Sequence, residues 1–215
     1  SALVSFKENL FILKRQSLWR NSGYSNADFA IQKVSSGIGC KDGRTVASGD
    51  NGIYFLGDDT IWMYDGSKLT DLGYLLRDGY LNDVYIDSSS ASFQAGALFA
   101  KNRYRLGYRT QSTEKYAAYA LDFNELTQVW SRTQLSGYPS VWHYPASLTD
   151  KVIAAGNDCK VYQIETGGHD DAAAHSLEWV SHSIDFGDKL VNKVIDKVFL
   201  SVDSTWTTTA NAYFV

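Results

Sequence analysis

Short apolar segments alternate with short polar turns along most of the chain. The clearest example is Ile53–Leu56, which is followed by a turn at residues 57–59 and by a second apolar segment at Ile61–Tyr64. An apolar strand, a short turn rich in Gly, Asn or Asp, and a second apolar strand form the pattern of a β-hairpin. The sequence predicts four such hairpins, with first turns at Asn9, Asp59, Asn102 and Asp158.

A further polar turn and a further apolar segment follow most of these hairpins. Residues 15–17, 65–67 and 123–125 are turns of this kind. Each unit is therefore expected to be an antiparallel meander of three or four strands. The first turns recur about every 45–55 residues, close to the repeat of about 40–50 residues expected of propeller blades. An irregular stretch near residues 111–116 interrupts this spacing.

Several predicted strands are apolar on both faces. A strand with one face in water alternates apolar and polar side chains, whereas Ile53–Leu56 and Ile61–Tyr64 are apolar throughout. Residues 170–175 are the only helix-like stretch, so the sequence offers no helices to cover these strands. Other sheets are therefore expected to cover them. Stacked blades cover both faces of a strand better than a two-sheet sandwich, in which each sheet keeps one face exposed to water. We therefore predict an all-β fold: a β-propeller-like array of four to six antiparallel meander blades.

The pattern changes near residue 175. The segments at 178–180, 184–187 and 191–202 are interpreted as long strands that leave the repeat. We predict a β-propeller over residues 1–175. Residues 176–215 are expected to hold closing strands and the start of a truncated second β domain. The first residue is not Met and the last four have strand character, which favours a piece of a longer protein.

Composition supports a β protein and argues against several other classes. With 14% aromatic residues, 17 Gly, 2 Pro and 1 Met, the chain favours strands and glycine turns over a helical bundle. A net charge of −4 offers no global positive field for gripping nucleic acid. Cys40 and Cys159 are far apart and are expected to be free thiols. No apolar run approaches the ~20 residues that span a bilayer, so no membrane segment is predicted.

The candidate catalytic groups in the sequence have simpler explanations. Asp58 and Asp59 share a tight turn, where neighbouring carboxylates point apart instead of converging on one bond. The spacing of His169 and His175 does not place both rings on one helix face for a metal. Residues 201–206 are similar to the Asp-box turn of sialidase-like propellers, but its glycine is missing. We predict no catalytic residue, no metal site and no cofactor, and a protein that is not an enzyme.

Three arginines form the first part of a candidate interaction surface. Arg103, Arg105 and Arg109, together with Lys101, place positive charge on one side of a strand whose other side is apolar. This stripe could meet DNA or an acidic neighbour. The alternative is a solvated outer strand whose arginine side chains extend into water.

Three adjacent ring side chains form the second part. Trp142, His143 and Tyr144 could stack on a sugar. The alternative is aromatic packing in the core or at a blade edge.

Three motifs in the first half of the chain form a recurring sequence pattern. A glycine-rich segment at 37–40 leads into a strand at 51–57 and then into the motif Ile-x-x-Tyr-Asp-Gly at 61–66. Residues 11–20 and 120–131 fit the same pattern. Together, over roughly residues 3–165, these segments resemble the propeller blades of tailed-bacteriophage virion proteins. Such propellers occur in neck and tail-nozzle subunits, including tail-tubular-B-type and packaged-DNA-stabilisation-type proteins.

This resemblance implies a structural virion protein, in the neck or in the tail nozzle or tube, that acts as an assembly scaffold around the DNA exit path. It implies a homo-oligomeric ring of the full-length protein, other virion subunits as partners and passive contact with DNA. A closed propeller usually needs about five or more blades, so terminal strands or missing sequence would complete the four clear units. Two alternatives are a carbohydrate-binding propeller that recognises a host-surface glycan, and a propeller hydrolase that uses loop carboxylates.

Overall fold

The chain divides into two compact units, Ser1–Gly167 and Gly168–Val215. The computed structural model describes residues 1–25, 27–77, 79–85, 95–111, 117–138, 140–146, 149–155, 160–164, 169–170 and 173–174. In the second unit, β16 (His169–Asp170) pairs with β17 (Ala173–Ala174) in antiparallel fashion. The expected helical stretch at 170–175 is therefore wrong where it is described. The predicted β domain at 176–215 lies outside the described residues and stays a prediction.

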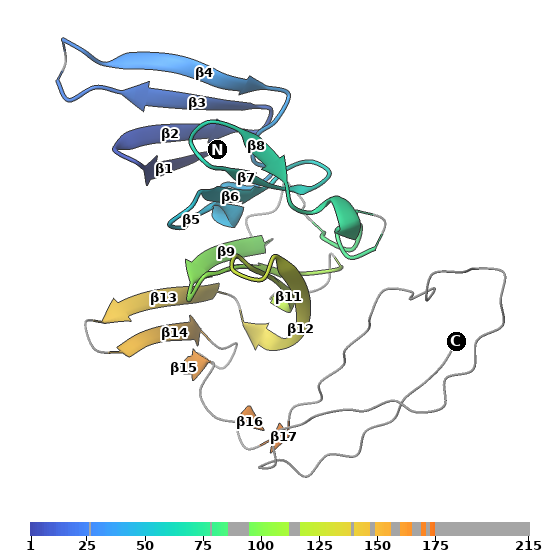
Figure 1. Ribbon diagram of the computed structural model, residues 1–215. Helices are drawn as coiled ribbons and strands as arrows, with labels where there is room; N and C mark the ends of the chain where they lie inside the picture. Colours follow the sequence, from blue (N-terminus) through green and yellow to red (C-terminus); the bar gives the residue numbers. More distant parts are fainter. Residues whose placement is uncertain are drawn as a thin grey trace, which may run out of the picture. The chain divides into compact units, whose positions relative to one another are not determined.

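Sheet 1 is the first of four antiparallel meanders (Figure 1). Its two central strands share a register in which Phe11 lies opposite Arg20, and its third and fourth strands are offset by a bulge between Leu18 and Trp19. The strands follow one another in the sheet in chain order: β1 (Ala2–Phe6), β2 (Asn9–Lys14), β3 (Ser17–Ser22) and β4 (Ala30–Ser36).

Sheet 2 is a shorter meander with a 3-10 turn on each side. The turn η1 (Gly43–Thr45) precedes it and η2 (Tyr74–Leu76) follows it. Its strands are β5 (Ala47–Ser48), β6 (Ile53–Leu56), β7 (Ile61–Tyr64) and β8 (Leu69–Asp71).

Sheets 3 and 4 continue the same plan. Sheet 3 contains β9 (Ala95–Ala100), β10 (Arg103–Tyr108), β11 (Ala117–Asn124) and β12 (Val129–Tyr138). Sheet 4 contains β13 (Ser140–Ala146), β14 (Thr149–Ala155) and β15 (Val161–Ile164). All four predicted hairpins and the predicted meanders of three or four strands are thus confirmed.

The central strand of sheet 2 is buried on both faces. All four residues of β6 are at most 4% exposed. Ile53 and Phe55 pack against sheet 1 in a core that includes Phe11. Tyr54 and Leu56 point to the other face and pack in a second core with side chains of β10 and β11. The prediction that other sheets cover this strand on both sides is confirmed.

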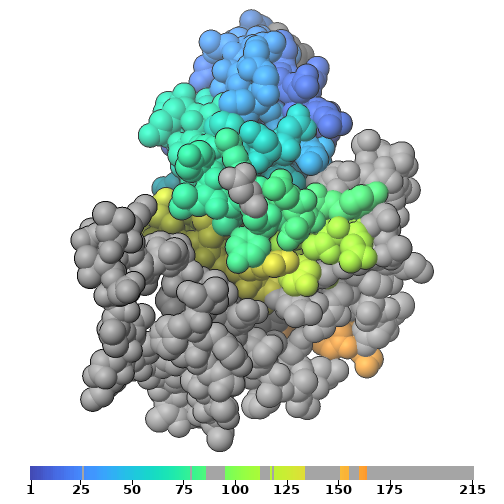
Figure 2. All heavy atoms as spheres, turned by 90° about the vertical axis from the view of Figure 1, so that its right-hand side faces the viewer, coloured from blue at the N-terminus to red at the C-terminus, as the bar shows by residue number. Residues whose placement is uncertain are grey.

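The same face-to-face packing continues to sheet 4. Leu98 and Ala100 of β9 form a third cluster with Val152 of β14. The four sheets of the first unit therefore stack in chain order, and in Figure 2 the blue atoms of sheet 1 border the green atoms that follow it. The residues that the structure describes show no closed ring. The propeller and its blade number remain predictions.

The segment between sheets 1 and 2 is bonded to both. The amide of Cys40 donates to the Lys14 carbonyl at 2.9 Å, and the amide of Lys41 donates to the Leu56 carbonyl at 2.8 Å. A Cβ atom on Gly39 would collide with the Lys14 carbonyl, so only glycine fits this approach. Cys40 is a buried free thiol, and burial raises its pKa. Cys159 lies outside the described residues.

Candidate interaction surfaces

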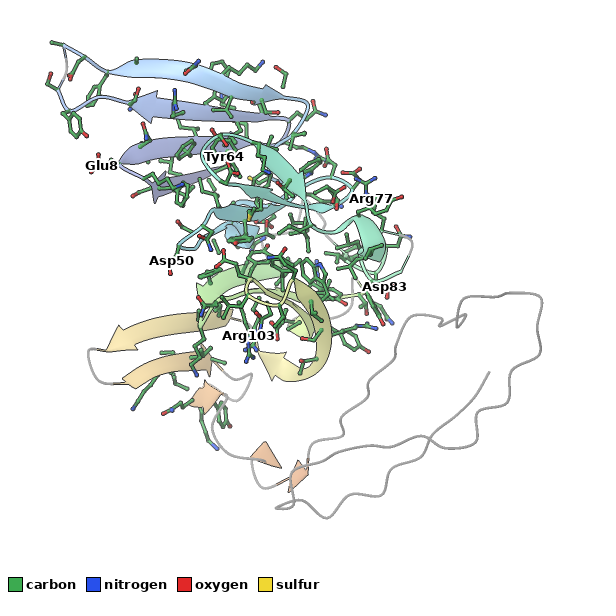
Figure 3. All side chains as sticks on the ribbon, in the orientation of Figure 1. Glu8, Asp50, Tyr64, Arg77, Asp83 and Arg103 are labelled. Atoms are coloured by element: carbon green, nitrogen blue, oxygen red, sulfur yellow. The ribbon has the colours of Figure 1, made fainter. Side chains whose placement is uncertain are left out.

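The expected arginine stripe on β10 does not lie open to water. Arg103, the first residue of the strand, is exposed (Figure 3). Arg105 instead forms a two-pronged ion pair with Asp122 of β11, through Nε at 2.7 Å and Nη2 at 2.9 Å. The two side chains are only 12% and 6% exposed. The solvated-strand expectation is corrected for Arg105, because its charge is matched inside the protein.

The position of this ion pair explains its burial. In register, Arg105 lies between Leu98 of β9 and Asp122 of β11, so all three share one face of sheet 3. Leu98 on that face packs with Val152 of sheet 4. The ion pair therefore belongs to the face of sheet 3 that sheet 4 covers. A fork-shaped guanidinium suits a carboxylate in such a place because both hydrogen bonds form at once.

Arg109 is also buried, at 3% exposure. Its guanidinium carbon lies 5.1 Å from the centre of the Tyr85 ring. Its carbonyl accepts the Tyr85 amide at 2.9 Å. Arg109 thus ties the segment after η2 to the end of β10. The expectation that it lies on an exposed interaction surface is corrected, because its contacts are internal.

Trp142, His143 and Tyr144 lie in the middle of β13. Their backbone pairs with residues 151–153 of β14, and His143 is opposite Val152, which is 1% exposed. The side chains of the three ring residues lie outside the part of the chain that the structure describes. The glycan surface stays a prediction.

The paired carboxylates of the β6–β7 turn lie near separate cations. Asp58 is 3.5 Å from Arg15, and Asp59 is 3.5 Å from Arg77. Side-chain exposures of 44% and 66% match the prediction that these acids point apart towards solvent. Among the described residues, no group of three or more His, Cys, Asp or Glu side chains could hold a metal ion. No helix in that part of the chain is long and apolar enough to cross a membrane.

One polar contact between sheets 2 and 3 was not predicted. The hydroxyl of Tyr54 on β6 donates to the carboxylate of Glu125, which lies in the turn between β11 and β12. Tyr54 is fully buried and Glu125 is 8% exposed. Burial, helped by the bond to Glu125, raises the pKa of Tyr54 above its ordinary value. The two residues are 71 positions apart, and nothing in the spacing of the sequence pairs them.

Two more hydrogen bonds join sheet 3 to the segments that flank sheet 2. The Tyr104 hydroxyl donates to the Thr45 carbonyl at 2.8 Å, and the Trp130 indole N–H donates to the Leu72 carbonyl at 2.9 Å. Each aromatic ring packs in the core between the sheets while its polar end finds a backbone acceptor. These bonds add polar contacts to the apolar core between the two sheets.

The outer face of sheet 1 is apolar and uncovered in the described part of the chain. Leu3 is 68% exposed, Leu10 is 38% exposed and Ile31 is 65% exposed. The signal for this face was present in β2, where Leu10–Leu13 is apolar at every position, as β6 is. We define the outer face by its large and charged side chains: Leu3, Leu10, Ile12, Lys14, Trp19, Ile31 and Lys33.

Together these features define an all-β chain built of stacked antiparallel meanders, with an internal ion pair between Arg105 and Asp122 and, among the described residues, an open outer face on sheet 1. Neither protein-family models nor curated proteins give a match to the chain.

Proposed function

We propose that this chain is a structural component of a tailed-bacteriophage virion, in the neck or in the tail nozzle or tube. It acts there as a non-catalytic assembly scaffold around the DNA exit path. The observation that carries the proposal is the double burial of β6 between sheets 1 and 3. Stacked meanders of this kind suit a rigid wall, because stability is spread over repeated contacts between neighbours. The phage setting comes from the resemblance of the blade motifs.

The proposed partners are further copies of the full-length protein, arranged in a ring, and other virion subunits. Contact with DNA is expected to be passive. Of the three arginines first considered, Arg103 is the exposed one, whereas Arg109 is buried and the side chain of Arg105 is only 12% exposed. A protein with a net charge of −4 suits a channel through which DNA slides without binding tightly.

Mass photometry of the full-length protein tests the scaffold role. We expect a discrete ring mass that persists on dilution into the nanomolar range. A glycan array probed with the same preparation separates the scaffold from a host-surface receptor. A monomer at every concentration, combined with selective glycan binding, would overturn the proposal in favour of a carbohydrate-binding protein.

A further inference from the structure

The two faces of sheet 1 differ in what covers them. On the inner face, Phe11, Leu13 and Leu18 are at most 2% exposed, because β6 and β7 of sheet 2 pack on them. The ring of Tyr64, where the two sheets meet (Figure 3), lies 5.4 Å from that of Phe11. On the outer face, Leu3 is 68% exposed. The same sheet is thus packed on one side and open on the other.

The open side chains form ordered rows. In register, Leu3 lies opposite Ile12, Ile12 opposite Trp19, and Trp19 opposite Lys33. A second row contains Leu10 and extends to Ile31 on β4 through Asn21. Such rows of cross-strand neighbours resemble those that the inner faces of this stack bury. A sheet face is therefore a better geometric match to this surface than an irregular loop.

Charge narrows the choice of partner. The ammonium groups of Lys14 and Lys33 lie 5.8 Å and 5.4 Å from the centre of the Trp19 ring. Strands β1–β4, all of which the structure describes, contain no Asp or Glu. The outer face of sheet 1 is therefore apolar and purely cationic in a chain whose net charge is −4.

We propose that the outer face of sheet 1 docks an apolar, acidic β-sheet face of another protein subunit. The inference rests on the proposed scaffold function and names the chemistry of its neighbour. Carboxylates on the partner would meet Lys14 and Lys33, while its apolar side chains would cover Leu3 and Ile12. Two copies meeting back to back through this face would set lysine against lysine, which disfavours a second copy. A lipid surface is disfavoured because Trp19 is half-buried between two lysines and does not project.

The test uses the full chain and a defined probe. The probe is a disulfide-closed β-hairpin peptide that presents alternating Leu and Glu on one face, and the control peptide carries Lys in place of Glu. Binding is measured by calorimetry at low and at physiological salt. Two charge variants are compared with the unaltered chain: Lys14→Glu with Lys33→Glu on the outer face, and Lys68→Glu with Lys160→Glu elsewhere. Vesicles of phosphatidylglycerol are a separate arm.

We expect the Glu hairpin to bind and the Lys hairpin not to bind. The K14E/K33E variant should bind the Glu hairpin at least about tenfold more weakly and should gain binding to the Lys hairpin, since interfacial charge sets partner choice. The K68E/K160E variant should behave like the unaltered chain. Equal binding of both hairpins, binding of neither, self-association lost in K14E/K33E, or binding to the vesicles would each overturn the inference.

The two proposals fail separately. If the full-length protein forms rings but the Glu hairpin does not bind, the docking inference alone is overturned. If the hairpin binds as expected but no ring forms, the scaffold function alone is overturned.

Discussion

The turn between β1 and β2 forces two ordinary residues into an unusual backbone conformation. Lys7 and Glu8 have φ angles of 45° and 62°, the left-handed region in which glycine and asparagine are favoured. The turn holds because a two-residue hairpin with this twist matches the right-handed twist of its strands. Glu8 lies at the tip of this hairpin (Figure 3). The sequence predicts the hairpin from its apolar flanks, but Lys-Glu does not indicate the turn type.

Replacing Glu8 tests this strain. Glu8→Gly and Glu8→Ala both remove the hydrogen bond from Tyr24 to the Glu8 carboxylate, but only Ala keeps a Cβ. We expect Gly to be more stable than Ala here by about 1 kcal/mol, the reverse of their order in a helix. Urea denaturation of the two variants measures the difference. Equal stabilities would show that this position carries no left-handed strain.

Buried tyrosines make the protein sensitive to alkali. Burial raises the pKa of Tyr108 to about 12 and raises the pKa values of Tyr54 and Tyr104 as well. A tyrosine with a raised folded-state pKa keeps its proton in the native state while the unfolded chain ionises near 10. The stability from these three groups is therefore complete below pH 10 and is lost as the pH rises through the folded-state values.

We expect the unfolding free energy to be flat from pH 8 to about pH 9.5 and to fall steeply above pH 10. Absorbance at 295 nm should show these tyrosinates forming only as the fold is lost. Tyr74→Phe is the control, since Tyr74 is 67% exposed and its replacement should leave the alkaline limb unchanged. Full, reversible ionisation of every tyrosine by pH 11 without loss of structure would contradict the buried positions.

At the scale of elements, neighbouring strands contribute partners that cannot be paired from the sequence. Arg105 and Asp122 are 17 positions apart and meet because β10 and β11 pair in one register. A pair of charges under a covering sheet is costly to break, since the remaining charge is left without its partner in a poorly solvated place.

Removing one of the two charges should therefore lower stability much more than removing both. Asp122→Leu alone should cost about 3–5 kcal/mol of unfolding free energy and Arg105→Met alone should also destabilise the chain, whereas the two substitutions combined should leave stability close to that of the unaltered chain. Urea denaturation of the two single variants and of the double variant completes the cycle. Losses that simply add would contradict a buried pair and support an exposed arginine.

The pattern along the chain therefore predicts strands and their covering, but not partners. The apolar run at β6 correctly predicts a strand buried on both faces, because burial leaves a local mark at each position. Arg105 was wrongly expected to be solvated. The alternation of apolar and charged residues along β10 is the same whether water or another sheet covers the charged face. The bond from Tyr54 to Glu125 was missed for a related reason, since register and sheet stacking decide it rather than local spacing.

At the scale of the first unit, the chain builds a stack of meanders from a repeated local plan. Sheet 2 lies within this stack. It is joined to sheet 1 by an apolar core, and to sheet 3 by a second core and the hydrogen bond from Tyr54 to Glu125. Two further side-chain bonds from sheet 3 reach the segments that flank sheet 2. Both the scaffold function and the docking inference require that the two faces of sheet 2 be closed to water. If one face of sheet 2 were exposed to water, neither the scaffold function nor the docking inference would keep its structural basis.

Cysteine labelling tests that claim most directly. Ile53→Cys and Leu56→Cys place a thiol on opposite faces of β6, and Leu3→Cys places one on the outer face of sheet 1. All three are made in a chain with Cys40→Ala and Cys159→Ser, and the rate of reaction with a maleimide is measured under native conditions. We predict rapid labelling at position 3, and labelling at 53 and 56 no faster than global unfolding. Labelling at either position 53 or position 56 as fast as at position 3 would show that one face of sheet 2 is open, and would contradict the stacked fold.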